Sequence, residues 1–352
     1  MIPKNNAKNI LYLSYNDGSD MRINKEVTTL SKFALVDFMG IGECQTNCFI
    51  NITSVQKIFW TNANRKTVRG NLKYFSKAIW LLVTKKYHSI HVINETQLFI
   101  LWPLLFIQKN VVVDVFDSIF LKKNYSGNKL QRIKQILYWP AKTIIVTDQN
   151  RYNLLPDSLK FKTNILPNYP FKFNQKSLKS TSNELTIIYF GWIGSKRGTE
   201  TILRILDTGL PVKIIMAGWL ADEESKQLIK HKNVTWYGTV SQAEAFQLAQ
   251  AGNYILCVYA PIHENNINAS PNKIFDAIQL QKPLIINREI VISKFVEDEE
   301  IGYILPKYSE NNWMDIVLDL SKLKDSYTFK PSLIETYTWE NVANKLLESH
   351  HL

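Results

Sequence analysis

Short apolar runs alternate with helical patterns along the whole chain, and this alternation occurs once in each half. The runs have the length of strands, and the stretches between them, such as 24–31 and 242–251, have the spacing of amphipathic helices. Strands that alternate with helices form parallel sheets, so the sequence predicts an α/β chain with two parallel sheets, each flanked by helices. The runs lie at residues 10–14, 33–39, 89–93, 111–115 and 143–147, and at 185–190, 212–217, 234–237, 254–259 and 283–287.

Chain length and one polar stretch predict where the two halves separate. The chain has 352 residues, too many for one ordinary core. Residues 164–183 are polar and contain prolines, as linkers do, so we place the boundary after residue 172. Open parallel sheets bind ligands outside the carboxyl ends of their strands. We therefore expect a cleft between the domains, with the functional residues on the loops that follow the strands.

The stretch INASPNKIFDAIQLQKPLIIN, residues 267–287, predicts a helix that leads into a buried strand. Ser270 is expected to cap this helix, and Pro271 to take its first position. Asn272, Lys273 and Asp276 then lie in the first two turns. A helix N-terminus beside a lysine favours phosphate, and an acid one turn further on is suited to a sugar hydroxyl.

A second loop of the same half offers positive charge. GWIGSKRGTETIL follows the strand that ends at Phe190, and its Gly191 and Gly194 allow the backbone a tight turn. Lys196 and Arg197 follow at the start of the next helix. Taken alone, this loop is equally well explained as a solvated basic turn, and it has neither P-loop nor G-x-G-x-x-G spacing. Together with Lys273, it predicts a diphosphate site.

The net charge of +11 is unevenly distributed. Residues 1–172 hold 24 Lys+Arg and 10 Asp+Glu, a balance of 24 − 10 = +14, whereas residues 173–352 give 18 − 21 = −3. A one-sided basic field attracts membranes, nucleic acids or phosphorylated acceptors. The helical pattern at 71–87 carries Phe75, Ile79 and Leu82 among lysines. It either packs on its sheet or rests on anionic lipid.

The order of the motifs resembles that of GT-B glycosyltransferases, and of the large retaining family 4 group among them. Each motif is degenerate, and the resemblance depends on their succession over nearly the whole chain. In the first half these are SDMRINKEVTTLSKFALVDFMGIGE, VVVDVFDSIF, AKTIIVTDQNRYNLL and NILPNYP. In the second half they are FGWIGSKRGTETI, VTWYGTVSQAEAFQLAQAGNYILCVY, ASPNKIFDAIQLQKPLII, IGYILP and TYTWENVANKLLE.

The resemblance implies two Rossmann-like domains and a role for each. Residues 1–172 would bind the acceptor, residues 173–335 would bind a nucleotide sugar, and a helix at 336–352 would pack back on the first domain. Arg197 falls where the family has a phosphate-binding lysine, and Asp276 where it has a ribose-binding glutamate. Asn268 and Trp192 depart from the pattern, since relatives have Glu and Arg there. Gly191, Gly194, Lys196, Ser270, Asn272 and Lys273 complete the expected donor site.

Candidate residues in the first half are fewer. Glu95, Asp117 and His91 follow or end strands and are the catalytic candidates, although His91 is equally well explained as a core histidine. Gly18 and Arg22, in the loop after the first strand, are expected on the acceptor side of the cleft by topology.

No Asp-x-Asp occurs in the sequence, whereas metal-dependent GT-A enzymes usually bind their metal through such a pair. We therefore expect no metal and no cofactor, with fixed positive groups stabilising the departing diphosphate.

The expected function is retaining, hexosyltransferase-type transfer from a nucleotide diphosphate sugar to a hydroxyl of a glycan or lipid-linked acceptor, in polysaccharide biosynthesis. The expected location is the cytoplasm, peripheral on the inner face of the cell membrane, with an anionic membrane surface as partner. A two-domain nucleotide-sugar epimerase and a non-catalytic nucleotide or nucleic-acid binder are the alternatives. The chain has no recognised nucleic-acid motif, so nucleic acid is not expected.

Overall fold

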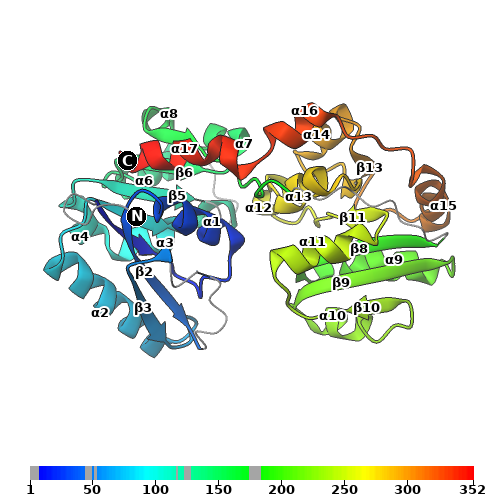
Figure 1. Ribbon diagram of the computed structural model, residues 1–352, viewed down its shortest axis with the longest axis horizontal. Helices are drawn as coiled ribbons and strands as arrows, with labels where there is room; N and C mark the ends of the chain where they lie inside the picture. The colour runs from blue at the N-terminus through cyan, green and yellow to red at the C-terminus, as the bar shows by residue number, and fades with distance from the viewer. Residues whose placement is uncertain (1–7, 44–49, 51–53, 116–117, 123–127, 174–183) are drawn as a thin grey trace. The chain divides into compact units, whose positions relative to one another are not determined.

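The computed structural model describes residues 8–43, 50, 54–115, 118–122, 128–173 and 184–352, and it confirms the predicted fold class (Figure 1). The chain forms two compact units. Unit 1 contains residues up to Asn168 together with Trp339–Leu352, and unit 2 contains Tyr169–Thr338. From the sequence we expected the corresponding boundaries after residues 172 and 335.

Unit 1 holds a seven-stranded sheet in which every pair of neighbours is parallel, in the order β3-β2-β1-β4-β5-β6-β7. Its edge strands β3 and β7 were not predicted, because their short sequences are only partly apolar and partly buried. The strands are β1 (Asn9–Leu13), β2 (Leu35–Gly42), β3 (Lys57–Asn62), β4 (Ser89–Ile93), β5 (Val111–Val115), β6 (Thr143–Val146) and β7 (Thr163–Ile165).

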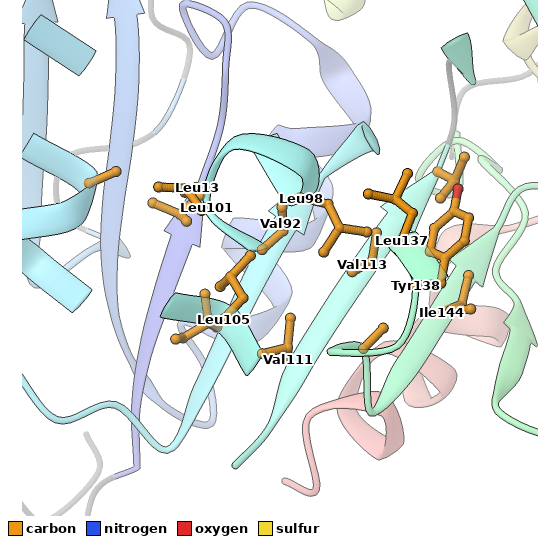
Figure 2. Packing of buried hydrophobic residues seen from close by; sticks show 14 of the residues in the cluster. Leu13, Val92, Leu98, Leu101, Leu105, Val111, Val113, Leu137, Tyr138 and Ile144 are labelled. Atoms are coloured by element: carbon orange, nitrogen blue, oxygen red, sulfur yellow. The ribbon is translucent and has the colours of Figure 1, made fainter. Parts of the chain in front are cut away.

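Helices cover both faces of this sheet. On one face, Leu98, Leu101, Leu105 and Leu137 pack on apolar side chains of the strands, as Figure 2 shows. The caps that begin α1 and α2 are Asp20, which accepts from the Arg22 N–H, and Thr67, which accepts from the Gly70 N–H. The helices are α1 (Met21–Leu30), α2 (Val68–Thr84), α3 (Asn94–Ile100), α4 (Trp102–Phe106), α5 (Ile119–Lys122), α6 (Asn128–Leu137), α7 (Gln149–Asn153), α8 (Asp157–Lys160) and α17 (Trp339–Ser349).

The helix α17 belongs to unit 1 although it follows the whole of unit 2 in the chain. Trp339 is buried against α1, where its indole N–H donates to the Thr29 hydroxyl (2.8 Å) and the Lys25 ammonium lies 5.1 Å from its ring centroid. Beyond the helix, His350 is buried with its Nδ1 2.6 Å from the Ser89 hydroxyl. The end of the chain therefore completes the core of unit 1.

Unit 2 holds a six-stranded parallel sheet in the order β10-β9-β8-β11-β12-β13. In both units the first strand lies inside the sheet, and the order reverses beside it. The strands are β8 (Leu185–Ile193), β9 (Val212–Leu220), β10 (Val234–Trp236), β11 (Tyr254–Leu256), β12 (Leu284–Asn287) and β13 (Gly302–Leu305). The helices are the 3-10 turn η4 (Ser195–Arg197), α9 (Thr199–Asp207), α10 (Glu223–Leu228), α11 (Gln242–Gln250), α12 (Glu264–Ile267), α13 (Asn272–Leu280), α14 (Ser293–Asp298), α15 (Trp313–Leu323) and α16 (Pro331–Thr336).

A buried cluster of charges joins α1 to the centre of the first sheet. The Arg22 guanidinium donates from Nε and Nη2 to both oxygens of Asp114 (2.7 and 2.9 Å) and from Nη1 to the Leu166 carbonyl (3.0 Å). Its Nε also lies 3.0 Å from Glu26. Because all three charged side chains are excluded from water, each depends on the others for compensation.

We predict that Arg22→Met strongly destabilises unit 1. The change leaves the Glu26 and Asp114 carboxylates buried without their cation, which costs about 3–5 kcal/mol. Denaturant unfolding followed by circular dichroism measures the loss. Arg132→Met, on the exposed side of α6, is the matched control and should change stability by less than about 0.5 kcal/mol. Equal stability of the two variants would show that the cluster does not hold α1 in place.

Candidate functional site

At the carboxyl edge of the second sheet, β8 and β9 face each other through two glycines. Gly191 and Gly218 are paired in the register of these strands, and both have positive φ (95° and 142°). A Cβ on Gly218 would lie 1.8 Å from the Gly191 carbonyl oxygen, so no side chain fits there. A Cβ on Gly191 would lie 3.8 Å from Cε of Lys273. The predicted glycine loop and the predicted helix start therefore meet.

Arg197 is held in place by backbone contacts and by two aromatic rings. Its N–H donates to the Gly194 carbonyl (3.0 Å), and the preceding Ser195 N–H donates to Asp222 (2.6 Å). The guanidinium carbon lies 4.8 Å from the ring centroid of Trp192 and 4.7 Å from that of Tyr259. Aromatic faces attract cations. The two rings therefore fix the orientation of Arg197.

Lys273 lies beside this arginine, in the first turn of α13. Its ammonium is 4.8 Å from the ring centroid of Tyr189, and the side chain is half-buried. Burial lowers the pKa of Lys273 to about 8, and the positive charge of Arg197 contributes to the decrease, whereas Cys257 and Asp276 oppose it. The positive charges of Arg197 and Lys273 repel each other. An anion that contacts both side chains would therefore favour the charged form of Lys273.

The start of α13 differs from the prediction by one residue. Pro271 is the N-cap, with an extended ψ of 130°, the helix begins at Asn272, and no side chain caps it. The prediction that Ser270 caps the helix was therefore wrong, because Pro271 remains extended and separates Ser270 from the first turn. Asn272 is exposed, and Asp276 is buried with the Gln242 amide 3.4 Å from its carboxylate.

Lys196, in the 3-10 turn η4, is the basic residue of the predicted donor site that pairs with an acid. Its ammonium contacts Glu200, in the first turn of α9, and the same carboxylate accepts from the Tyr308 hydroxyl (3.0 Å). The Lys196 side chain is about half exposed. Arg197 and Lys273 thus form the cationic pair, and Lys196 lies outside it.

In unit 1, His91 is a core residue. Its ring stacks on Tyr12 with centroids 4.3 Å apart, and its Nδ1 lies 3.0 Å from Nε2 of His350. Burial lowers the pKa of His91 to about 4, so the ring is neutral at pH 7. The catalytic prediction for His91 is corrected to a structural role, because the side chain has no access to solvent.

Glu95 is also fully buried, and its carboxylate is saturated with donors. It accepts from the Ser118 hydroxyl (2.6 Å), the Ile119 N–H (3.2 Å) and the Tyr138 hydroxyl (2.9 Å). Glu95 therefore anchors the segment after β5 to α6 and does not face a substrate, which corrects its catalytic prediction. Asp117, the third catalytic candidate, lies outside the described residues.

The acceptor-side predictions differ in outcome. Arg22 is buried in the charge cluster described above, so the prediction that it faces a cleft is corrected. Gly18 lies in the turn between β1 and α1 with φ of 74°, and its N–H donates to the Asn16 side chain (2.8 Å). That turn is at the carboxyl edge of the first sheet, as topology predicted.

Glu26, His91 and Asp114 have the spacing of a metal site, with one ligand atom from each within 4.8 Å of the others. A cation already lies at this position, because the Arg22 guanidinium contacts both carboxylates. We therefore interpret this group as a buried structural cluster in which one cation, Arg22, faces two carboxyl groups, and burial raises the pKa of Asp114 to about 7. Its members come from three different elements, and sequence spacing alone gave no sign of it.

The sequence matches no protein-family model and no curated protein sequence. Solved structures do resemble the fold. Sucrose-phosphate synthase from Thermosynechococcus elongatus is similar with a TM-score of 0.70 at 13% identity, over 98% of both chains. HepE from Anabaena, solved in complex with UDP-glucose, has a TM-score of 0.69 at 14% identity, over 97% of this chain and 99% of HepE. A glycosyltransferase from Rickettsia africae has a TM-score of 0.66 at 12% identity, over 98% of both chains. The chain therefore has the two-domain GT-B fold.

We predict that anion binding by the cationic pair weakens as pH rises through about 8. Lys273 loses its charge there, whereas burial raises the pKa of Tyr189 and Cys257 to about 12, so neither titrates in this range. Calorimetric titration with sulfate, which keeps its charge, should show a several-fold loss of affinity between pH 7 and pH 9.5. Lys273→Arg should remove this pH dependence. The same pH dependence in both proteins would exclude Lys273 as the titrating group.

Proposed function

We propose that this protein is a glycosyltransferase that moves a sugar from a nucleotide diphosphate sugar to a hydroxyl group. The observation that supports it most is the pair formed by Arg197 and Lys273 beside the open backbone of Gly191. The pair lies at the carboxyl edge of a parallel sheet, next to the point where the strand order reverses. Nucleotides bind at such points in open α/β sheets.

The chemistry of transfer explains why two fixed cations are needed. The bond between the anomeric carbon and the diphosphate oxygen breaks, and negative charge accumulates on the leaving diphosphate. Cations already oriented toward that charge stabilise the transition state without further reorganisation. The rings of Trp192 and Tyr259 hold Arg197 in such an orientation before any ligand binds. Asp276, one turn beyond Lys273, is proposed to accept from the ribose hydroxyls.

The proposal also includes finer features of the reaction that the family 4 resemblance implies. They are retention of anomeric configuration, hexosyl transfer without a metal, and a glycan or lipid-linked acceptor bound by the first unit. Structures with similar folds include one bound to UDP-glucose and one of a lipopolysaccharide galactosyltransferase. A uridine nucleotide is therefore the first donor to test. A peripheral position on the inner face of the cell membrane suits a lipid-linked acceptor.

The alternative enzyme, a nucleotide-sugar epimerase, would use the same cationic pair but return an isomerised sugar. Incubation with a panel of nucleotide sugars separates the possibilities. A transferase releases free nucleoside diphosphate and forms a glycosylated acceptor, an epimerase gives an isomeric sugar, and a non-catalytic binder gives neither product.

Truncation of either cation should impair use of the donor. Arg197→Ala and Lys273→Ala each remove a charge-assisted contact worth about 1.5–3 kcal/mol, so kcat/KM for the donor should fall about 10- to 150-fold. Steady-state kinetics with varied donor concentration measures the effect. Lys196→Ala, which removes a neighbouring lysine paired with Glu200, is the matched control and should stay within about threefold of the wild type. Unchanged kinetics in the Arg197 and Lys273 variants would exclude the diphosphate assignment.

The second prediction of this proposal concerns metals. Chelation with EDTA should leave transfer largely intact, because Arg197 and Lys273 provide the positive charge that a metal ion would otherwise supply. The measurement is transfer rate before and after dialysis against chelator. A complete loss of activity that Mg²⁺ or Mn²⁺ restores would contradict the metal-independent mechanism.

A further inference from the structure

Exposed apolar side chains are concentrated on one side of unit 1. More than half of the large apolar residues exposed in the described chain lie between Val68 and Trp139. All but Ile119 belong to helices α2, α3, α4 and α6 or directly follow α4 and α6, and the inner sides of these helices pack on the same face of the first sheet. The outer sides of these helices therefore form one surface of unit 1.

The helix α2 is apolar on both sides. Its inner side buries Tyr74, Ala78 and Leu81, and the same helix exposes Leu72, Trp80 and Val83. The exposed fractions of the Trp80 and Val83 side chains are 50% and 68%. The sequence allowed Phe75, Ile79 and Leu82 either to pack on the sheet or to contact lipid, and in the structure Phe75 and Leu82 face the core whereas Ile79 faces outward. The exposed apolar side of α2 therefore differs from the set that the sequence indicated.

An aromatic ridge continues this surface across α4 and α6. Trp102 stacks on Phe106 with centroids 5.4 Å apart, and the Phe106 ring meets that of Trp139 at 5.8 Å. The Trp102 indole donates to the Ile136 carbonyl (3.1 Å) and so ties the two helices together. Trp139 and Ile107 remain 64% and 72% exposed. A soluble monomer rarely exposes so many contiguous large apolar groups.

The exposed charges that the structure describes along this segment of the chain are positive. Between residues 68 and 142, the acids that the structure describes are Glu95 and Asp114, and both are fully buried. The basic side chains there are mostly exposed, including those of Arg69, Lys73, Lys109, Lys129 and Arg132. The described residues of this segment therefore present apolar groups among cations, and Asp157 of α8, paired with Lys160, is an exposed acid close to α6.

We propose that the outer side of α2, α4 and α6 is a docking surface for anionic lipid bilayers. Leu72, Trp80, Val83, Phe106, Ile107 and Trp139 define this lipid-docking surface. Tryptophan favours the membrane–water interface, aliphatic groups enter the acyl region, and Lys and Arg attract anionic headgroups. Charge complementarity selects a bilayer over a second copy of the chain, since two copies would bring like charges together. None of the helices described is long and apolar enough to cross a membrane.

This inference stands on residues of unit 1 and is independent of the proposed donor site. The test is vesicle cosedimentation, with vesicles of phosphatidylglycerol and phosphatidylcholine compared with phosphatidylcholine alone. The wild type should bind only the anionic vesicles. Added salt should weaken this binding and leave a salt-resistant part, because the apolar groups insert once the charges have brought the surface close.

Two sets of variants separate the apolar and the charged contributions. Phe106→Ser with Trp139→Ser should weaken vesicle binding at least about tenfold and abolish the salt-resistant part. Phe33→Ser, which removes a 52% exposed phenylalanine that follows α1, is the matched control and should bind as the wild type does. Lys109→Glu with Arg132→Glu should weaken binding at least about tenfold. The charge-matched control, Lys294→Glu with Lys322→Glu in unit 2, should lose much less.

Denaturant unfolding followed by circular dichroism, which reports on both units, checks that every variant is folded. Sulfate binding at the cationic pair of unit 2 is measured separately, so a failure of lipid docking is distinguishable from a failure of the proposed function. Equal binding of the wild type and the Phe106/Trp139 variant to anionic vesicles would overturn the inference. So would an absence of wild-type binding to anionic vesicles. A dimer, seen by analytical ultracentrifugation, that the same double substitution dissociates would then assign the surface to a second copy of the chain.

Discussion

Parallel strands impose the constraint on which the rest of this structure depends. A parallel neighbour can be added only after the chain has crossed over one face of the sheet, so both faces are covered and every strand ends at the same edge. In unit 2 this edge collects residues that are far apart in sequence. Arg197 follows β8, Tyr259 follows β11, and Lys273 begins the helix that leads to β12. The site is thus a product of the crossover rule.

The two units differ in how they surround the basic side chains near the carboxyl edges of their sheets. In unit 1, Arg22 is drawn inside, where Asp114, Glu26 and a carbonyl satisfy it completely. In unit 2, Arg197 and Lys273 are only half-buried and contact aromatic rings, which attract a cation without neutralising its charge. A charge that rings hold in place retains its attraction for an anion. This difference explains why anion binding is assigned to unit 2.

Sequence periodicity was sufficient to predict the two parallel sheets and to bring the loop of Arg197 together with the helix of Lys273. It could not predict which polar side chains are internal. His91 is buried because its partner is His350, 259 residues away, and Glu95 is buried because Ser118 and Tyr138 surround it. The alternation of apolar and polar residues indicates which face of a strand or helix is buried. It does not indicate which side chain compensates a buried polar group, because that partner is set by packing between elements distant in the sequence. The edge strands β3, β7 and β13 were missed because they are short and partly exposed, whereas the edge strand β10 was predicted.

The position of α17 has a consequence for biosynthesis. Unit 2 is one continuous segment, so all of its contacts are available once Thr338 has emerged from the ribosome. Unit 1 begins the chain, yet the space beside Thr29 is filled by Trp339 and the space beside Ser89 and His91 by His350. During translation the first domain made is therefore the last to be completed. Until then it presents an unfilled apolar groove and unpaired buried polar groups, which are the features that chaperones bind and proteases attack.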